Sequence, residues 1–222
     1  MCDRPEIRPT HDGSHTLFLP RMNECYHSRY GAIQESRHVF IRAGFLGVAK
    51  DRVRILEIGF GTGLNALLTL LEAEKRPIPR IEYHGVEPCP LPSEITDALN
   101  YEALLCPERK GIFAALHRVA WDRPTEFTPR FLLHKIKGDS RCCTLPRDVD
   151  LVYFDAFAPE KQPRMWTLEI FRRLRRCMAP GGILTTYCAK GEVRRTMEKA
   201  GYSLERIPGP PGKREMLRAI CI

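Results

Sequence analysis

The fold of this 222-residue chain is decided by the stretch Leu56-Glu57-Ile58-Gly59-Phe60-Gly61-Thr62-Gly63-Leu64-Asn65. It begins in an apolar segment, 54–58, that predicts a buried strand. It runs into 64–73, which predicts a helix that is apolar on most sides and therefore packs against a sheet. The glycines between them allow a tight turn and let the backbone approach a ligand without obstruction by a Cβ atom. Because free N–H groups at the helix start suit a carboxylate or a phosphate, the stretch predicts a cofactor cradle.

Two cofactors fit this glycine loop. The spacing Gly61-x-Gly63-x-x-Ala66 satisfies the dinucleotide fingerprint. Glu57, two residues before the first glycine, favours S-adenosylmethionine (SAM) instead. A carboxylate there would repel a pyrophosphate, but it can lie near the ammonium group of the methionine. A plain tight turn is the alternative interpretation.

Acidic residues follow the later predicted strands. Glu87 comes directly after 80–86, at roughly the distance expected for a carboxylate that binds ribose hydroxyls, a device that both cofactors use. Asp139 ends the strand predicted over 131–136; SAM enzymes often have an acid here for the adenine amino group, although a helix cap explains it nearly as well. Asp155 ends the fourth strand beside aromatic and small residues. It is well placed to meet a substrate, with a capping role as the competing interpretation.

From residue 53 onward, predicted strands alternate with predicted helices, which indicates a mostly parallel sheet with right-handed crossovers. The last two strands have only the short loop 208–212 between them, so they can pair as a hairpin. We therefore expect a Rossmann-like α/β class I SAM-dependent methyltransferase fold, with a mostly parallel seven-stranded sheet that ends in an antiparallel hairpin. The expected strands are 54–58, 80–86, 131–136, 149–154, 182–187, 202–207 and 215–221, and the expected helices are 64–73, 93–105, 107–117, 166–178 and 192–200.

Residues 1–52 differ from the rest and predict a small N-terminal extension or lid, with 53–222 as the methyltransferase domain. Within the extension we expect a strand over 16–19, a turn over 23–28 and a helix over 33–45.

The composition bounds the class of protein. The net charge of +8, with basic clusters at 172–176, 194–195 and 213–214, points to a polyanionic partner such as nucleic acid. Nine cysteines are scattered without a metal-ligand spacing, so we expect reduced thiols and no metal site. No apolar run reaches the roughly 18–20 residues that span a bilayer. The N-terminus has no signal-peptide pattern either, so we expect a cytoplasmic protein with no membrane contact.

Several segments together resemble the MnmC-type tRNA methyltransferase domain. They are Tyr26-His27-Ser28, Gln34-Glu35-Ser36-Arg37-His38-Val39-Phe40, 57–65, 155–166 and 212–217. The resemblance covers nearly the whole chain, whose length implies the standalone form without an oxidoreductase domain. It implies methyl transfer from SAM to the 5-aminomethyl amine of the wobble (2-thio)uridine in the tRNA anticodon region. Separate enzymes would make the aminomethyl precursor.

The resemblance also implies roles for single residues. Asp155 matches the acid that takes part in deprotonating the amine, although Ala156 stands where a glycine is common. In the family, the loop matching Gly59 to Asn65 holds SAM. Together with the acids already singled out from the sequence pattern, the residues expected to hold the cofactor are Glu57, Gly59, Gly61, Gly63, Asn65, Glu87 and Asp139. Residues implied to bind the substrate are Tyr26, Glu35, Ser36, Phe157, Lys161, Lys213 and Arg214. No role follows for 89–130.

Three other functions stay open on the sequence. A SAM-dependent methyl- or aminopropyltransferase acting on a small amine would use the same loop and the same acid, but the basic charge and the Lys213-Arg214 loop argue against it. A non-catalytic nucleotide-binding module is disfavoured by Asp155 and its aromatic neighbours. An NAD-dependent enzyme is disfavoured by Glu57 and by the closing hairpin.

Overall fold

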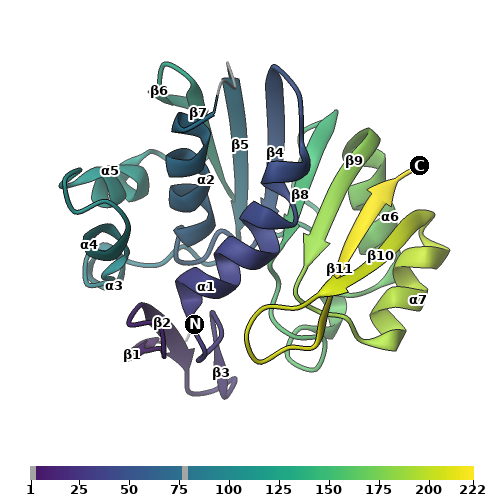
Figure 1. Ribbon diagram of the computed structural model, residues 1–222, viewed down its shortest axis with the longest axis horizontal. Helices are drawn as coiled ribbons and strands as arrows, with labels where there is room; N and C mark the ends of the chain where they lie inside the picture. The colour runs from purple at the N-terminus through teal and green to yellow at the C-terminus, as the bar shows by residue number, and fades with distance from the viewer. Residues whose placement is uncertain (1–3, 77–79) are drawn as a thin grey trace.

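The computed structural model describes residues 4–76 and 80–222. Its centre is an eight-stranded sheet with the order β10-β11-β9-β8-β4-β5-β7-β6 (Figure 1). The strands from β9 through β8, β4 and β5 to β7 pair in parallel, and β11, β10 and β6 are antiparallel additions. The strands are β4 (Arg52–Ile58), β5 (Arg80–Glu87), β6 (Thr125–Thr128), β7 (Phe131–Lys137), β8 (Val149–Phe154), β9 (Met178–Thr186), β10 (Tyr202–Pro208) and β11 (Glu215–Cys221). The expected fold class, including the closing hairpin, is confirmed.

The sheet has one strand more than the seven we expected. The additional strand, β6, has four residues, pairs with β7 at the sheet edge and has an irregular register between Glu126 and Thr128. Its polar–apolar alternation is too short to stand out from a loop. The expectation of seven strands is therefore wrong, because it lacks this edge strand. β6 lies within 89–130, the region where the sequence showed no usable pattern.

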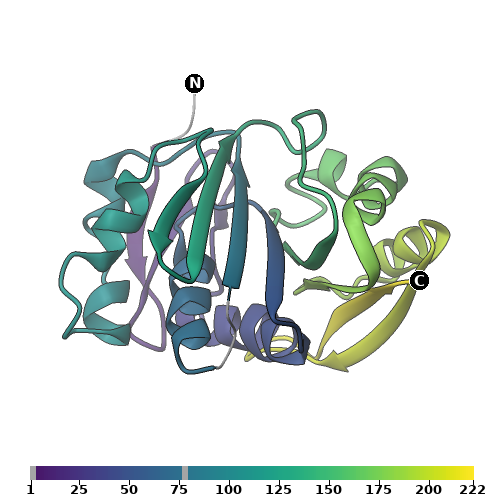
Figure 2. The ribbon, with the colours of Figure 1, turned by 90° about the horizontal axis from the view of Figure 1, so that it is seen from above.

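Helices cover both faces of the sheet. The first face, which carries Ile55 and Tyr83, packs against α1, η1 and α2, and the second, which carries Leu56 and Val152, packs against α6 and α7. Figures 1 and 2 show α2 and α6 on opposite sides of the strands. The helical segments are α1 (Ala32–Ser36), the π-helical turn η1 (Arg37–Arg42), η2 (Phe45–Gly47), α2 (Leu64–Glu74), α3 (Ser93–Thr96), α4 (Tyr101–Leu105), α5 (Ile112–Arg118), η3 (Pro163–Met165), α6 (Leu168–Cys177) and α7 (Gly191–Lys199).

Segment 93–105 is not the single helix that we expected. It forms α3 and α4 with a break before residue 101. At the break the Asn100 side chain accepts a hydrogen bond from His15 N (2.9 Å) and donates one to Gly13 O (2.8 Å). The bonds to the extension replace a helical turn, so a tertiary contact overrides the local helix propensity.

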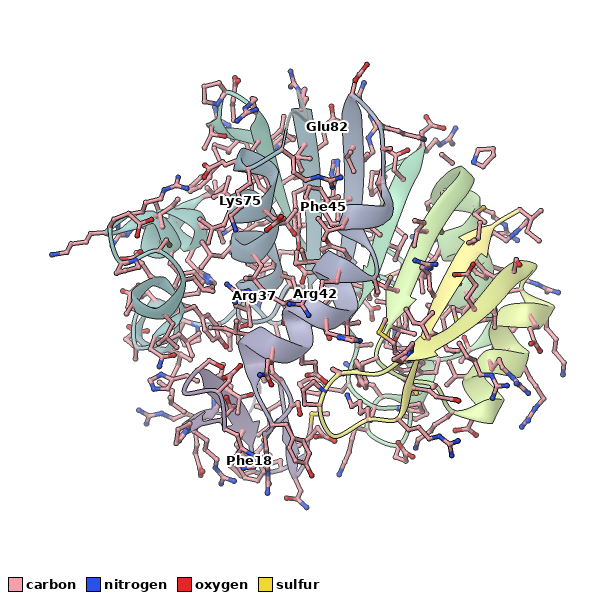
Figure 3. All side chains as sticks on the ribbon, viewed as in Figure 1. Phe18, Arg37, Arg42, Phe45, Lys75 and Glu82 are labelled. Atoms are coloured by element: carbon pink, nitrogen blue, oxygen red, sulfur yellow. The ribbon has the colours of Figure 1, made fainter. Side chains whose placement is uncertain are left out.

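The N-terminal extension is packed into the core of the domain. Its small sheet consists of β1 (Glu6–Pro9), β2 (His15–Leu19) and β3 (Glu24–Cys25), of which only the β2 region was expected as a strand. Leu17 and Phe40 belong to the same buried cluster as Ile55. Phe45, fully buried in that cluster, lies on the face that α2 covers (Figure 3). β4 begins at Arg52, next to the expected division between 1–52 and 53–222, and that division stays a prediction.

The structure also bears on two expectations from the composition, that the cysteines are reduced and that no segment spans a membrane. Cys89 takes part in a disulfide, so the expectation of reduced thiols is wrong at that position. The other described cysteines are free: Cys25, Cys106, Cys142, Cys143, Cys177, Cys188 and Cys221. Within residues 4–76 and 80–222, no helix has the length and apolar character to cross a membrane.

Truncating Phe40 tests whether the extension is part of the core. This side chain is 1% exposed and its ring centre lies 5.1 Å from that of Tyr153 on β8. We expect Phe40→Ala to lower the free energy of unfolding by about 3–5 kcal/mol, measured by urea denaturation, because it leaves a cavity beside the sheet. Leu46→Ala is the control, since Leu46 is 40% exposed and its truncation should cost about 0.5 kcal/mol. Equal effects of the two substitutions would contradict a shared core.

Candidate active site

A cleft of about 920 Å³ opens where the carboxyl ends of β4, β5 and β8 meet the N-terminal extension. Its walls come from the glycine loop, the end of β5, the segment after β8, residues 23–30 and the β10–β11 loop. Figure 1 shows that loop, in yellow, reaching across toward the extension. The volume is that of a small-molecule or cofactor site, and its place at the strand ends is the usual one in open α/β sheets.

The glycine loop lies where no side chain would fit. Gly59 has a φ of +90°, and a Cβ there would lie 2.7 Å from the backbone oxygen of Asp155. Gly61 has a φ of +46°, and a Cβ there would meet the ring of Tyr26 at 3.1 Å. Both glycines line the cleft. Gly63 does not line the cleft. This residue caps α2 with a φ of +74°, and a Cβ there would lie 2.8 Å from His117 Nε2.

Two histidines hold Thr62 of the glycine loop, one through its side chain and one through its backbone. His27 Nε2 lies 2.8 Å from Thr62 Oγ1, and His117 Nε2 donates to the Thr62 backbone oxygen at 3.0 Å. Burial lowers the pKa of each imidazole to about 4, so both are neutral near pH 7. Neither was predicted as a site residue. His27 lies in a segment that carries the family resemblance, but His117 has no sequence signal because its partner is distant in the chain.

Glu87 lies at the end of β5 with its carboxylate at the cleft. One oxygen accepts a hydrogen bond from Gly61 N (3.0 Å) and the other from Cys89 N (2.9 Å). Burial raises its pKa, and the two backbone donors oppose that rise. A carboxylate fixed in this way beside the loop suits ribose hydroxyls.

Asp139 also lines the cleft, but its carboxylate is engaged. Arg141 Nε lies 2.9 and 2.8 Å from its two oxygens, and these charge-assisted bonds lower the pKa of Asp139. Asp139 Oδ1 also accepts a hydrogen bond from Arg141 N at 2.9 Å, so the carboxylate caps the turn that follows as well as forming the ion pair. The expected contact with the adenine amino group stays a prediction.

Glu57 is not part of the cleft, in contrast to its expected place beside the cofactor. The side chain is fully buried, and its two oxygens accept bonds from Asn65 Nδ2 and from the Tyr83 hydroxyl, both at 2.8 Å. Val53, Ile55 and Glu57 are two residues apart along β4 and so lie on the same side of the strand. Glu57 therefore points into the face that α2 covers. Asn65 does line the cleft.

Asp155 follows β8 at the floor of the cleft. Its Oδ2 accepts a hydrogen bond from Asn65 Nδ2 at 2.9 Å. Removal from bulk water, together with the nearby Glu35 charge, raises the pKa of Asp155 to about 7 against the opposing effects of Asn65 and Lys213. A carboxyl group with this pKa can accept a proton near neutrality.

An ion pair faces Asp155 from the other wall. Lys213 Nζ lies 2.6 Å from Glu35 Oε1 and 3.8 Å from the ring centre of Tyr187. The second oxygen of Glu35 accepts from Ser28 N at 2.8 Å. Ser36, next to Glu35, is buried outside the cleft wall, and Arg214, next to Lys213, is exposed on the outside. The expected substrate residues thus divide into an inner group and two that do not line the cleft.

The segment after β8 completes the wall. The Phe157 ring meets the Tyr26 ring edge to face at 5.1 Å, and Trp166 Nε1 donates to the Phe157 backbone oxygen at 2.8 Å. Lys161 Nζ donates to Met22 O at 2.7 Å, which ties this segment to the extension. Two aromatic faces and a carboxyl group therefore border the same space.

These residues fit SAM. The loop backbone is open to a ligand at Gly59 and Gly61, and Glu87 supplies a carboxylate for the ribose. Asn65 Oδ1 is buried and has no donor among the described residues, so it is an acceptor suited to an ammonium group such as that of the methionine.

Comparisons with known proteins agree with this geometry. A family model described as S-adenosyl-L-methionine-dependent methyltransferase matches residues 127–221. The tRNA 5-methylaminomethyl-2-thiouridine biosynthesis bifunctional protein MnmC of Pseudomonas fluorescens is 33% identical over 214 residues, which cover 88% of this chain and 32% of that protein. The protein of the same name from Aromatoleum aromaticum is 31% identical and covers 97% of this chain and 35% of its own length. The chain spans about a third of the length of these curated relatives.

A solved structure covers nearly the entire chain. The crystal structure of MNMC2 from Aquifex aeolicus superposes with a TM-score of 0.77 at 28% identity. The match covers 98% of this chain and 70% of the other. Because a similarity of this extent includes the extension as well as the sheet, both parts have counterparts in that protein.

Substitution of Gly61 tests the role of the loop. We expect Gly61→Ala to weaken SAM binding at least tenfold, because the Cβ meets Tyr26 and the backbone is strained at a positive φ. Isothermal titration calorimetry measures the affinity. Gly181→Ala is the matched control, since Gly181 also has a positive φ, +75°, but has no atom within 4 Å of its Cβ position. If both variants bound SAM as the wild type does, the loop would not be the cofactor site.

Proposed function

This chain belongs to the S-adenosyl-L-methionine-dependent methyltransferases of the MnmC type, and we propose that it methylates the 5-aminomethyl amine of the wobble (2-thio)uridine in tRNA. The product is the 5-methylaminomethyl derivative. Separate enzymes supply the aminomethyl precursor, and the tRNA substrate places the activity in the cytoplasm. The observation that carries the proposal is Asp155, a carboxyl group with a pKa of about 7 at the floor of a cofactor-sized cleft.

The proposed reaction needs a proton acceptor. An alkyl ammonium has no lone pair, so the substrate amine must lose a proton before it can attack a methyl group. SAM supplies the electrophilic methyl group and a neutral thioether as the leaving group. Ionised Asp155 stabilises the incoming ammonium, orients its nitrogen and takes the proton at its free oxygen, Oδ1, since Oδ2 is engaged by Asn65.

The aromatic wall supports a nucleobase substrate. Tyr26, Phe157 and Tyr187 all line the cleft. Single-stranded bases in RNA are commonly recognised by stacking on such rings once they are turned out of the anticodon stack. The Tyr187 hydroxyl donates to Ala156 O at 2.8 Å, which holds that ring beside Asp155.

The rim of the cleft supports a tRNA partner. Arg29 and Arg164 line the cleft and are exposed, and the described residues offer neither guanidinium a carboxylate partner. Arg214 is exposed on the nearby loop. Unpaired guanidinium groups around a cleft mouth suit the phosphates that flank an inserted nucleotide.

Asp155→Asn tests the proton acceptor. We expect the turnover rate to fall by about 10²–10⁴-fold, because the amide keeps the shape of the side chain but accepts no proton. Mass spectrometry of tRNA nucleosides after incubation with SAM measures the product. SAM affinity should persist, which calorimetry checks.

The dependence of activity on pH gives a second test of Asp155 as the proton acceptor. Asp155 must be ionised to work, so wild-type activity should rise as the pH rises through about 7. The asparagine variant should lack that rise and should recover partly at alkaline pH, where more of the amine is already neutral. A variant with the wild-type rate and profile would show that Asp155 does not take the proton.

Charge reversal at the rim tests the tRNA partner. We expect Arg29→Glu with Arg164→Glu to raise the KM for tRNA at least tenfold and to flatten its dependence on salt, because fewer counterions are released. The KM for SAM should stay within about twofold, since phosphate contacts do not reach the cofactor. Arg172→Glu with Arg176→Glu is the matched control, because these two arginines are exposed on α6, away from the cleft. Equal loss in both double variants, or no salt dependence in the wild type, would favour a small amine as substrate.

A further inference from the structure

Four polar side chains, those of Tyr83, Glu57, Asn65 and Asp155, form a hydrogen-bonded line that ends at the floor of the cleft. Asn65 Nδ2 donates one hydrogen bond to Glu57 Oε1 at 2.8 Å and another to Asp155 Oδ2 at 2.9 Å. Glu57 is anchored in turn by the Tyr83 hydroxyl, 2.8 Å from its Oε2. Glu57 and Tyr83 are fully buried, whereas Asn65, which is 2% exposed, and Asp155 line the cleft, so the line reaches the cleft at its Asn65–Asp155 end.

The two carboxyl groups decide how the Asn65 amide is turned. An amide nitrogen carries two N–H donors, and here both are used. If the amide were flipped, Oδ1 would face a carboxyl oxygen on each side, and both contacts would be repulsive. Burial and the nearby Asp155 charge raise the pKa of Glu57, and the bonds from Asn65 and Tyr83 oppose that rise. The ionised form of Glu57 accepts hydrogen bonds and donates none, so the bonds that stabilise this form also favour the observed orientation of the Asn65 amide.

We infer that Asn65 is a positioning residue for Asp155, and that Glu57 holds the Asn65 amide in the orientation in which it donates. The inference rests on the proposed function only in taking Asp155 as the group that accepts the amine proton. Glu57 acts here at a distance, through Asn65, and not by contact with the cofactor.

The consequence for Asp155 is chemical as well as geometric. The bond from Asn65 occupies Oδ2 and leaves Oδ1 toward the cleft, which sets the direction from which a proton is taken. The same bond favours the ionised carboxylate against burial and the Glu35 charge, both of which favour the protonated form. Without the donor, less Asp155 would be ionised at neutral pH.

The experiment follows the Asp155 carboxyl carbon by NMR during a pH titration of the protein without SAM or tRNA. In Asn65→Leu, which has a similar volume and no donor, we expect the midpoint to rise by about 1–2 pH units. In Glu57→Gln we expect a smaller rise, because glutamine presents either a donor or an acceptor and no longer enforces one orientation of Asn65. The double variant should titrate as Asn65→Leu does.

Tyr83→Phe is the matched control. It removes the other hydrogen-bond donor to Glu57 from an equally buried place, and it leaves the Asn65 bonds intact. A loss of stability with an unchanged Asp155 midpoint is expected. If Asn65→Leu does not fold, Asn65→Ala removes the same donor with a residue that favours the first turn of α2.

Two results would overturn the inference. One is an Asp155 midpoint that is unchanged in Glu57→Gln while SAM affinity falls, which would return Glu57 to a cofactor contact. The other is an additive effect in the double variant, which would show that Glu57 acts independently of Asn65. Because the titration uses neither substrate, its outcome is separate from the proposed function, which is tested by whether the wild-type protein methylates aminomethyl tRNA.

Discussion

Close backbone contact at Gly59 brings the ends of three parallel strands to one place. Gly59 N donates to Val86 O at the end of β5, and Asp155 N donates to Ile58 O from the end of β8, each at 3.0 Å. The backbone oxygen of Asp155 lies 2.7 Å from the position that a Cβ of residue 59 would take. The cofactor loop, Glu87 and Asp155 therefore share one rigid support. A larger residue at position 59 would separate all three, because the contact is between backbones and no side chain can rotate away to relieve it.

Three carboxyl groups in this support, those of Glu57, Glu87 and Asp155, have three different roles. The role of each depends on its access to the cleft and on the hydrogen-bond donors around it. Glu57 is closed off, with both oxygens engaged by side chains, so it can act only on its neighbours. Glu87 is open to the cleft but held by two backbone N–H groups, which suits a fixed acceptor for hydroxyls. Asp155 is open and has a single side-chain donor, so burial dominates its pKa and makes it the one of the three suited to proton exchange.

The parts of the fold that local sequence determines were predicted correctly. The glycine loop, the parallel strands and the closing hairpin follow from periodicity and from glycine spacing, which act over a few residues. The break at Asn100 and the histidines that hold Thr62 depend on partners far along the chain, so no local pattern marks them. The place of Glu57 could have been found: strand alternation puts it on the side of Ile55 and away from the cleft, and proximity to the loop in sequence was the weaker guide.

The net charge of +8 does not show how the basic residues near the cleft are placed. Some lie inside the cleft and are paired, and others are exposed at its rim. A polyanionic partner is attracted by cations, yet the proposed reacting group is itself an ammonium and would be repelled by a free cation in the cleft. The ion pair between Lys213 and Glu35 removes that conflict, because the pair is neutral overall. The Lys213 ammonium also makes a cation–π contact with the Tyr187 ring. Arg214, one residue further along, is exposed and stays available for phosphates. Two neighbouring basic residues thus have opposite tasks. The inner one is neutralised by Glu35, so it does not offset the attraction between the substrate amine and the carboxylate of Asp155.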